Sequence, residues 1–319
     1  MFRLDKLPQT VLDEYKDKIL DGLVGRINAS KSLSISAKKV LLPICKKTRV
    51  DTRRLEALLI SEPQQLVSLN QELETQLRTL NKNKRPSNAE ILEIFNYDGL
   101  FNNGSKKLAF WLAKKIGRNT CTYCNRNYIF TVERNGGRNK HDRITRPFFD
   151  HYFPKSKYPL LSLSIYNLIP ACNLCNSALK GSLDMDLQNY LHPYVHNPLE
   201  IDFSFKVDIS EGQNEVEWKV KIDRKVGSKE DNTIKAFALD ELYAMHNELE
   251  IKDLVHFFTA YPKGYISTLQ EHLMGEALRP LTQMDVYRML FGAELERDKL
   301  LDRPLSKMKY DILKDNDVI

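Results

Sequence analysis

The chain of 319 residues lacks any uninterrupted run of the roughly 18 apolar residues that a membrane-spanning helix needs. Its first residues, MFRLDKLPQT, contain no apolar core of the kind that follows the basic residues of a secretory signal. Internal repeats, low-complexity tracts and the G-x-x-x-x-G-K-[ST] phosphate loop are also missing. We therefore expect a cytoplasmic protein in which any nucleotide-driven step would need a partner.

Cysteine is scarce, and four of the five cysteines form two Cys-x-x-Cys pairs, Cys121 with Cys124 and Cys172 with Cys175. In a reducing compartment such pairs are metal ligands more often than disulfides. Zinc takes four ligands in tetrahedral geometry, and four thiolates leave it no open position, so we predict a structural Zn2+. Two unrelated pairs or disulfides are the alternative. The fifth, Cys45, has apolar neighbours and is interpreted as a core thiol rather than a nucleophile.

The net charge of +6 is unevenly distributed. Residues 106–180 hold 14 Lys and Arg against three acidic residues, a charge of +11, so the rest of the chain carries −5. A basic block in an otherwise acidic protein favours a polyanion-binding face, although a solvated surface is the simpler alternative. Because the block coincides with the cysteine pairs, we favour nucleic-acid binding.

The N-terminal part is predicted to be helical. Apolar residues recur at helical spacing over residues 11–24 and again over 66–80, where Pro63 suits a helix start. The leucine row of 66–80 spans only about two heptads, so we expect it to pack within the chain rather than to form a coiled coil with a partner. Polar, basic residues 81–88 indicate a linker. Further helices are expected over 89–95 and 106–116.

The middle of the chain favours strands and then a helix. Residues 126–133 are rich in strand formers, and a Gly-Gly turn follows them. Residues 143–150 are expected to return as one strand that ends at Asp150-His151. Residues 175–180 are expected to begin a helix.

Beyond Pro198 the pattern changes twice. Apolar and polar residues alternate over 201–209 and 216–222, which predicts a β-hairpin with one buried face. Thr282-x-x-Asp285 resembles a capping box. Helical patterns return from about residue 232, with segments near 237–245, 266–273, 285–290 and 305–313.

An Asp-His pair and two asparagines accompany the cysteines: Asp150-His151, Asn167 and Asn176. Phosphodiester hydrolysis needs an activated water and a Lewis acid for the developing charge. A histidine that titrates near neutrality suits the base, and a carboxylate with an amide oxygen suits a hard cation such as Mg2+. Each feature is weak alone. The signal comes from their order, which is C-x-x-C, D-H, N-L, C-x-x-C-N, K-G.

In this order the chain resembles the HNH (ββα-metal) endonuclease family over residues 121–181. The matching positions are Cys121-x-x-Cys124, Asp150-His151 with Pro154, Asn167-Leu168, Cys172-x-x-Cys175-Asn176 and Lys180-Gly181. The resemblance implies that His151 is the general base and that Asn167 orients the loop and the base. It further implies that Asp150 and Asn176 hold a catalytic Mg2+ or Mn2+. The last position is often His in the family, and Asn176 here weakens any preference for a soft metal.

Basic residues near the motif are the candidate nucleic-acid contacts, namely Lys180, Lys155, Lys157, Arg146 and Arg126, with Arg134, Arg138 and Arg143 along the same stretch. Such contacts position a phosphate backbone without reading its sequence. Lys180 either meets a phosphate or is a solvated helix lysine. Of the remaining histidines, His192 and His196 are expected to be structural, with His192 the better candidate for a supporting role. The others, His141, His246, His256 and His272, are not expected to be ligands.

The flanking regions add a second resemblance. The helical N-terminal extension, the NYIF strand and the tail RPLSKMKYDIL resemble the HNH subunit that works beside an ATPase in Septu-type anti-phage systems. The resemblance implies an effector of bacterial defence with a partner ATPase.

Together these features predict an α+β protein. A ββα-metal HNH core with a structural four-cysteine zinc site would occupy residues 105–198. A helical N-terminal region (1–104) and a β-hairpin followed by helices (199–319) would flank it. The leading hypothesis is a metal-dependent endonuclease acting on DNA. The alternatives are an RNA-cleaving HNH nuclease and a zinc-stapled nucleic-acid-binding or scaffold module without catalysis.

Overall fold

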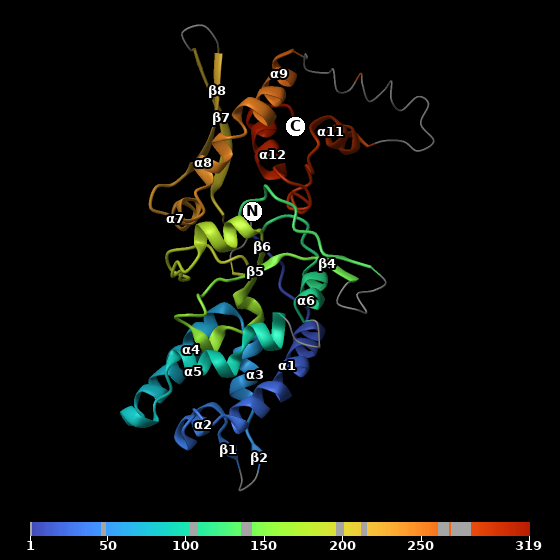
Figure 1. Ribbon diagram of the computed structural model, residues 1–319. Coiled ribbons are helices and arrows are strands. Elements are labelled where there is room, and N and C mark those ends of the chain that lie inside the picture. Colours follow the sequence, from blue (N-terminus) through green and yellow to red (C-terminus); the bar gives the residue numbers. More distant parts are fainter. Residues whose placement is uncertain are drawn as a thin grey trace.

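The computed structural model describes residues 2–45, 49–102, 108–134, 142–195, 201–211, 216–260, 268 and 282–319. The protein mixes helices (52%) with small two-stranded sheets (11% strand). Figure 1 shows N-terminal helices at one end, the short central strands in the middle, and a long hairpin with the C-terminal helices at the other end. Within the described residues, no helix is both long and apolar enough to cross a membrane.

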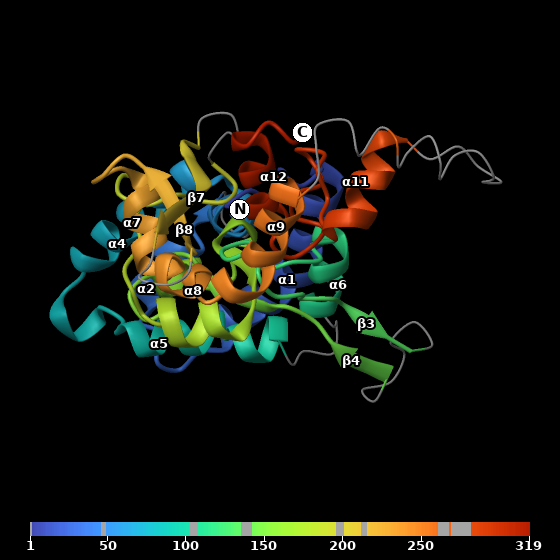
Figure 2. The same ribbon diagram turned by 90° about the horizontal axis from the view of Figure 1, so that it is seen from above.

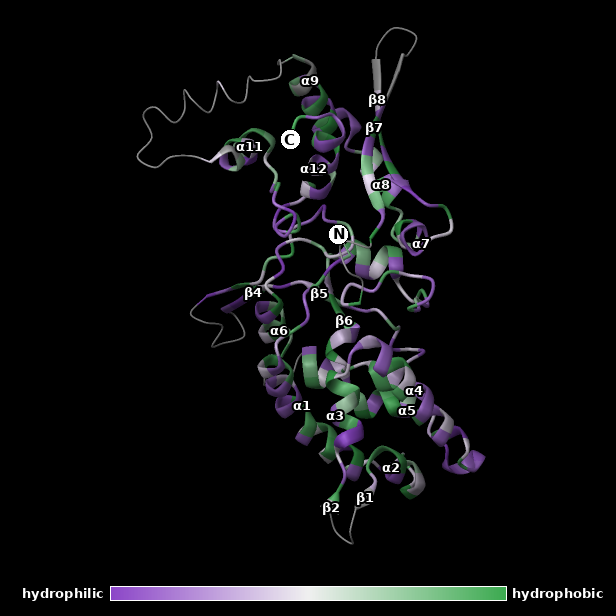
Figure 3. Ribbon diagram, turned by 180° about the vertical axis from the view of Figure 1, so that it is seen from behind, coloured by the Kyte–Doolittle hydropathy of each residue, from purple (hydrophilic) through white to green (hydrophobic). Residues whose placement is uncertain are grey.

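The N-terminal region is helical, as predicted. Its elements are α1 (Gln9–Ala29), α2 (Ile35–Leu41), β1 (Ile44–Cys45), β2 (Arg49–Val50), α3 (Arg53–Ile60), α4 (Pro63–Arg78), η2 (Lys82–Lys84) and α5 (Asn88–Phe95). The helices carry hydrophobic and hydrophilic residues in alternation along the ribbon in Figure 3, as amphipathic helices do. Pro63 stands in the first turn of α4, and Ser87 with Glu90 forms a capping box at α5. Cys45 ends β1, and its side chain lies outside the described part.

The leucine row of α4 packs inside the chain. Leu66, Leu73 and Leu77 are buried, and Leu69 and Leu80 pack against the same core. This is the intramolecular arrangement that the short row predicted. The core also joins this region to the middle of the chain, because the buried Tyr15 donates its hydroxyl to the Leu163 carbonyl at 2.7 Å.

The middle region contains the motif residues. Its elements are η3 (Asp98–Asn102), α6 (Leu108–Ile116), β3 (Val132–Glu133), β4 (Arg143–Thr145), β5 (Phe148–His151), η6 (Pro159–Leu161), η7 (Ile165–Asn167), β6 (Leu168–Ala171) and η8 (Leu174–Lys180). β3 pairs with β4, and β5 pairs with β6, both antiparallel. The helical turn η8 follows β6 directly, as expected for residues 175–180.

The predicted single strand over 143–150 is wrong. It is divided into β4 and β5, which belong to different sheets. Pro147 lies at the break, and a proline has no N–H to donate to a continuing ladder. Strand β5 therefore pairs with the apolar run Leu168–Ala171 and not with residues 126–133, of which only Val132–Glu133 form a strand.

The C-terminal region begins with the predicted hairpin. β7 (Phe203–Glu211) and β8 (Val216–Arg224) pair in nine antiparallel positions and form a sheet of their own. The helices that follow are α7 (Lys229–Ala236), α8 (Leu239–Ala244), η9 (Asn247–Ile251), α9 (Lys252–Ala260), α11 (Gln283–Phe291) and α12 (Ser306–Asp315). The capping box of Thr282 and Asp285 opens α11. The helix expected near 266–273 lies outside the described residues.

Candidate active site and metal centre

The two cysteine pairs meet at one buried point. The sulfur atoms of Cys121, Cys124, Cys172 and Cys175 all lie within 4.8 Å of one another, and Cys124 Sγ is 4.0 Å from Cys172 Sγ. A tetrahedral zinc site with Zn–S bonds of about 2.3 Å places its sulfurs about 3.8 Å apart. All four cysteines are free and buried. The cluster could therefore hold a metal ion such as zinc.

The backbone around the first pair forms a tight knuckle. Asn125 has a φ of 48°, in the left-handed region, and its N–H donates to the Cys121 carbonyl at 2.9 Å. Two backbone N–H groups point at sulfur: Arg126 N lies 3.5 Å from Cys124 Sγ, and Cys172 N lies 3.3 Å from Cys121 Sγ. Such donors favour the thiolate form, which is the form that ligates metal.

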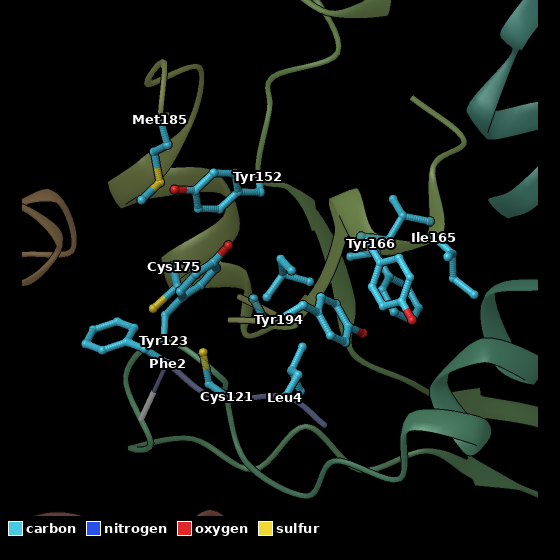
Figure 4. Close-up of a cluster of buried hydrophobic side chains, with 14 of the residues drawn as sticks. Phe2, Leu4, Cys121, Tyr123, Tyr152, Ile165, Tyr166, Cys175, Met185 and Tyr194 are labelled. Atoms are coloured by element: carbon cyan, nitrogen blue, oxygen red, sulfur yellow. The ribbon is translucent and has the colours of Figure 1, made fainter. Parts of the chain in front are cut away.

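Distant parts of the chain dock on this knuckle. Phe2 N donates to the Thr122 carbonyl at 2.9 Å, and Leu305 N donates to the Asn125 carbonyl at 2.7 Å. The Tyr243 hydroxyl donates to the Cys124 carbonyl at 2.6 Å. Figure 4 shows the buried side chains gathered around the cysteines, with Phe2 beside Tyr123. The cysteine cluster is thus the point where the N-terminus, the C-terminal region and the middle strands meet.

The β5–β6 pairing places the motif residues. Asp150 stands opposite Ile169, and His151 stands opposite Leu168. Asn167 directly precedes β6. The order is therefore strand, strand and helical turn, with Asp150 and His151 at the end of the first strand.

Asp150 is buried in an ion pair. Its Oδ1 lies 3.2 Å from Lys180 Nζ, and its Oδ2 accepts the Tyr123 hydroxyl at 2.7 Å. Both side chains of the pair are enclosed, with exposures of 0% for Lys180 and 3% for Asp150. Burial raises the pKa of Asp150, and the Lys180 charge opposes this shift. Lys180 also donates to the His151 carbonyl at 2.6 Å, so it is not a solvated helix lysine.

The ring of His151 is held from two sides. Its Nε2 lies 3.0 Å from the Ser162 carbonyl, and its ring meets Tyr97 edge-on with the centroids 4.5 Å apart. Because a carbonyl can only accept, Nε2 carries the proton in the neutral ring, and Nδ1 is left as the acceptor. Burial lowers the pKa of His151 to about 4. The ring is therefore neutral at pH 7, which is the form a general base needs.

Asn167 fixes the loop that follows His151. Its Oδ1 accepts from Phe153 N at 2.7 Å. Its Nδ2 donates to the carbonyls of Phe153 (3.1 Å) and Leu161 (2.9 Å). The side chain is fully buried, and its three hydrogen bonds join the two ends of the loop. The segment that carries Ser162, the partner of His151, is thereby held in place.

Asn176 lies apart from this network. It stands on η8 with an intermediate exposure, and its Nδ2 donates to Ser177 Oγ at 3.1 Å. Its described hydrogen bonds do not include Asp150. The structure thus brings Asp150, His151 and Asn167 together, and leaves Asn176 on the neighbouring turn.

The candidate nucleic-acid contacts have different surroundings. Lys155 is half-buried, and its Nζ lies 3.6 Å from Asp98 and 5.3 Å from the centroid of the Tyr97 ring that packs on His151. Lys157 is exposed and forms an ion pair with Asp184.

The two arginines among these candidates are half-buried. Arg146 donates to Asn102 and to the Pro147 carbonyl. Arg126 donates to His246 Nε2 at 2.9 Å. Of the five candidates, Lys180 contacts the His151 carbonyl directly, and Lys155 lies near His151 through Tyr97.

The other histidines do not join His151 among the described residues. His192 is fully buried, accepts from Tyr194 N at 3.2 Å and packs on the Tyr152 ring. His256 meets Trp218 edge-on. His141, His196 and His272, like Arg138, lie outside the described part of the chain.

Sequence reasoning missed three residues of the site: Tyr123, Tyr97 and Ser162. Tyr123 sits inside the first Cys-x-x-Cys pair, and that position was the one available signal for it. Tyr97 and Ser162 lie outside every motif. Ser162 acts through its backbone carbonyl, which any residue could supply. A role played by a backbone group cannot be recognised from the residue type.

Asp150 is only 2% exposed, and Lys180 and Tyr123 lie against its carboxylate. A cavity of about 810 Å³ lies elsewhere, between the N-terminal segment, β7 and the C-terminal segment, and Arg118, Phe205 and Leu301 are among its lining residues. A cation or a phosphate therefore reaches Asp150 only if Lys180 moves.

Comparison with protein-family models, with curated proteins and with solved structures found no match for this chain.

Proposed function

We propose that this protein is a metal-dependent endonuclease of the HNH type that hydrolyses phosphodiester bonds, with DNA favoured over RNA as substrate. The observation that carries the proposal is the setting of His151. Its Nε2 lies 3.0 Å from a backbone carbonyl, so in the neutral ring Nδ1 is the unprotonated nitrogen that can accept a proton. The strand, strand and helical-turn order of β5, β6 and η8 supports the same proposal, since a ββα core has this order.

In this mechanism His151 Nδ1 takes the proton from the attacking water, because the neutral imidazole is the form present at pH 7. The Ser162 carbonyl fixes the tautomer and the direction of the ring. Asn167 acts as a positioning residue, because its hydrogen bonds to Phe153 and Leu161 hold the segment that presents Ser162.

The groups around Asp150 fit a hard cation by their chemistry. The Lys180 ammonium, a positive charge, already sits between the Asp150 carboxylate and the His151 carbonyl oxygen. Carboxylate and carbonyl oxygens are the donors that Mg2+ prefers. We propose that Asp150, with Asn176 from the next turn, would hold Mg2+ or Mn2+. Such a cation would stabilise charge that develops on the phosphate.

The four cysteines are proposed to hold structural Zn2+, because four thiolates would complete a tetrahedral shell and leave no site for substrate. The wider proposals rest on the sequence resemblance alone: a cytoplasmic effector of anti-phage defence that works with an ATPase.

A second candidate function is a zinc-stapled nucleic-acid-binding or scaffold module without catalysis. The enclosed Asp150–Lys180 pair favours it, because a buried carboxylate that is already paired with a cation meets no substrate.

Cleavage of supercoiled plasmid and of a structured RNA, each in Mg2+ and in EDTA, tests the proposal. Wild type is expected to nick or cut DNA in Mg2+ and to leave it uncut in EDTA. If the protein cut RNA and not DNA, RNA would be the substrate, and the proposed hydrolysis of phosphodiester bonds would still hold. Binding without cleavage of either, also after co-purification with its partner, would establish the non-catalytic module instead.

A further inference from the structure

The exposed aromatic side chains are concentrated in one short stretch. Among the residues whose side chains are described, the exposed aromatics are Tyr128 (50%), Phe130 (44%) and Phe148 (48%). Scattered exposed apolar residues are ordinary, but neighbouring exposed aromatics mark an interaction site. Val132 and Ile144, of the same stretch, are exposed as well.

Along residues 128–132 the exposed side chains lie on one side of the backbone. Tyr128, Phe130 and Val132 alternate with the buried Ile129, as side chains do along an extended chain. The Tyr128 and Phe130 rings stack with their centroids 4.5 Å apart and their planes 20° apart. We name Tyr128, Phe130 and Phe148 the aromatic strip.

The strip runs from the cysteine knuckle to the candidate active site. Tyr128 pairs with Thr120, which directly precedes Cys121. Val132 pairs with Thr145 of β4, and Phe148 opens β5, two residues before Asp150. Figure 2 shows β3 and β4 projecting from the body of the molecule, where a long ligand can reach them.

Several arginines lie in the same stretch of the chain as the strip. The guanidinium groups of Arg143 and Arg146 lie 5.9 and 5.7 Å from the Phe110 ring, and Arg134 is exposed at the end of β3. Arg143 Nε is buried without a hydrogen-bond partner among the described residues. The acid of β3, Glu133, is paired with Lys114.

Aromatic rings beside arginines are what an unpaired nucleic-acid strand binds. Bases stack on the rings whatever their sequence, and the phosphates meet the cations. A duplex keeps its base faces covered and offers the strip only its backbone.

We propose that the aromatic strip is a platform on which unpaired bases of a nucleic-acid strand stack as the strand runs toward Asp150 and His151. The proposal rests on the proposed function and deepens it: the substrate carries a single-stranded segment next to the cut.

Binding in EDTA tests the platform without cleavage. The fluorescence anisotropy of a labelled 20-nucleotide oligo-dT and of a 20-base-pair duplex is measured against the full chain. Truncation of both rings in Tyr128→Ala/Phe130→Ala should weaken oligo-dT binding about 20-fold or more, since each stacked base contributes about fivefold or more. Duplex binding should change by less than about threefold, because it rests on the phosphates.

Three further double variants separate stacking from other effects. Tyr128→Trp/Phe130→Trp should keep or tighten oligo-dT binding. Tyr128→Leu/Phe130→Leu, which keeps an apolar surface, should lose it as the alanine variant does. The matched control Ile35→Ala/Val226→Ala truncates two exposed apolar side chains elsewhere and should bind as wild type.

Two results would overturn the platform: unchanged oligo-dT binding in the alanine variant, or full binding in the leucine variant, which marks the strip as a protein-docking surface. Neither of these binding results bears on the proposed nuclease function, which is tested separately by cleavage. Conversely, loss of oligo-dT binding in the alanine variant would support the platform even if no cleavage were found.

Discussion

At the scale of single residues, the least expected feature is the burial of charge at Asp150. A carboxylate with almost no exposure is stable only if its charge is compensated, and here Lys180 and Tyr123 compensate it. The same ammonium reaches the His151 carbonyl, so one lysine holds the end of β5 in place. The ion pair and the proposed divalent cation would therefore exclude each other at this position.

Lys180→Met should make stability depend on divalent cations. Breaking a buried pair by removing one partner costs about 3–5 kcal/mol, because the other charge is left uncompensated. Thermal unfolding should show a lower Tm in EDTA and a rise with Mg2+ or Mn2+ that exceeds the rise in wild type. The control is Lys157→Met, since its pair with Asp184 is exposed to solvent and contributes little to stability. If the two variants had the same cation response, Asp150 would not be a cation site.

At the scale of elements, local sequence patterns predicted the helices and the long hairpin, but they predicted the strand pairing less well. The helical spacing of 11–24, the alternation of 201–222 and the Thr282 capping box all predicted the observed elements. The partner of β5 was missed, because the break at Pro147 is local whereas the pairing with Leu168–Ala171 is set by the apolar core. The strand pattern of residues 143–150 placed His151 at a strand end, but it could not show that the Ser162 carbonyl holds its ring.

The hairpin β7–β8 is joined to α7 by one buried carboxylate. Asp231 accepts from Gly227 N at 2.9 Å and pairs with Lys235 and with Arg224, a β8 residue. These groups lower the pKa of Asp231 to about 2, with the Gly227 N–H the largest cause. Its stabilising contribution is therefore complete above about pH 4 and is lost as the pH falls toward 2.

Asp231→Asn should remove this contribution of roughly 2 kcal/mol. Urea unfolding at pH 7 should show the lower stability. The difference between variant and wild type should shrink between about pH 4 and pH 2, because protonation neutralises Asp231 in wild type as well. A difference that stayed constant down to pH 2 would show that Asp231 acts through packing and not through its charge.

At the scale of the whole molecule, the cysteine knuckle joins regions that are far apart in the sequence. Leu305 and Tyr243 bond to it from more than a hundred residues away. Hydrophobic periodicity indicates only which residues share a face of one helix or strand, so these long-range contacts could not be predicted from it. The four-cysteine cluster itself was predictable, because tetrahedral zinc demands four ligands and Cys-x-x-Cys spacing supplies two from one turn.

Removal of zinc should therefore destabilise the C-terminal region as well as the cysteine knuckle. Metal analysis of the purified chain should give about one zinc per molecule, since the four thiolates form a single site. A strong chelator, or Cys172→Ser, should lower the unfolding midpoint, because zinc-binding energy is folding energy at such a site. Protease sensitivity should rise in the C-terminal region as well, since Leu305 and Tyr243 dock on the knuckle. A zinc-free chain with unchanged stability would contradict a structural metal.

The single-turnover cleavage rate in Mg2+ tests whether His151 is the general base of the proposed nuclease. With the substrate that wild type cuts, His151→Ala should lower the rate by about 10²–10⁴-fold. Substrate binding in EDTA should stay within a few-fold of wild type, and added imidazole should restore part of the rate. The control is His256→Ala, in which the replaced histidine lies in α9 and packs on Trp218 of β8, and it should cut as wild type does. A His151→Ala rate within a few-fold of wild type would contradict the account.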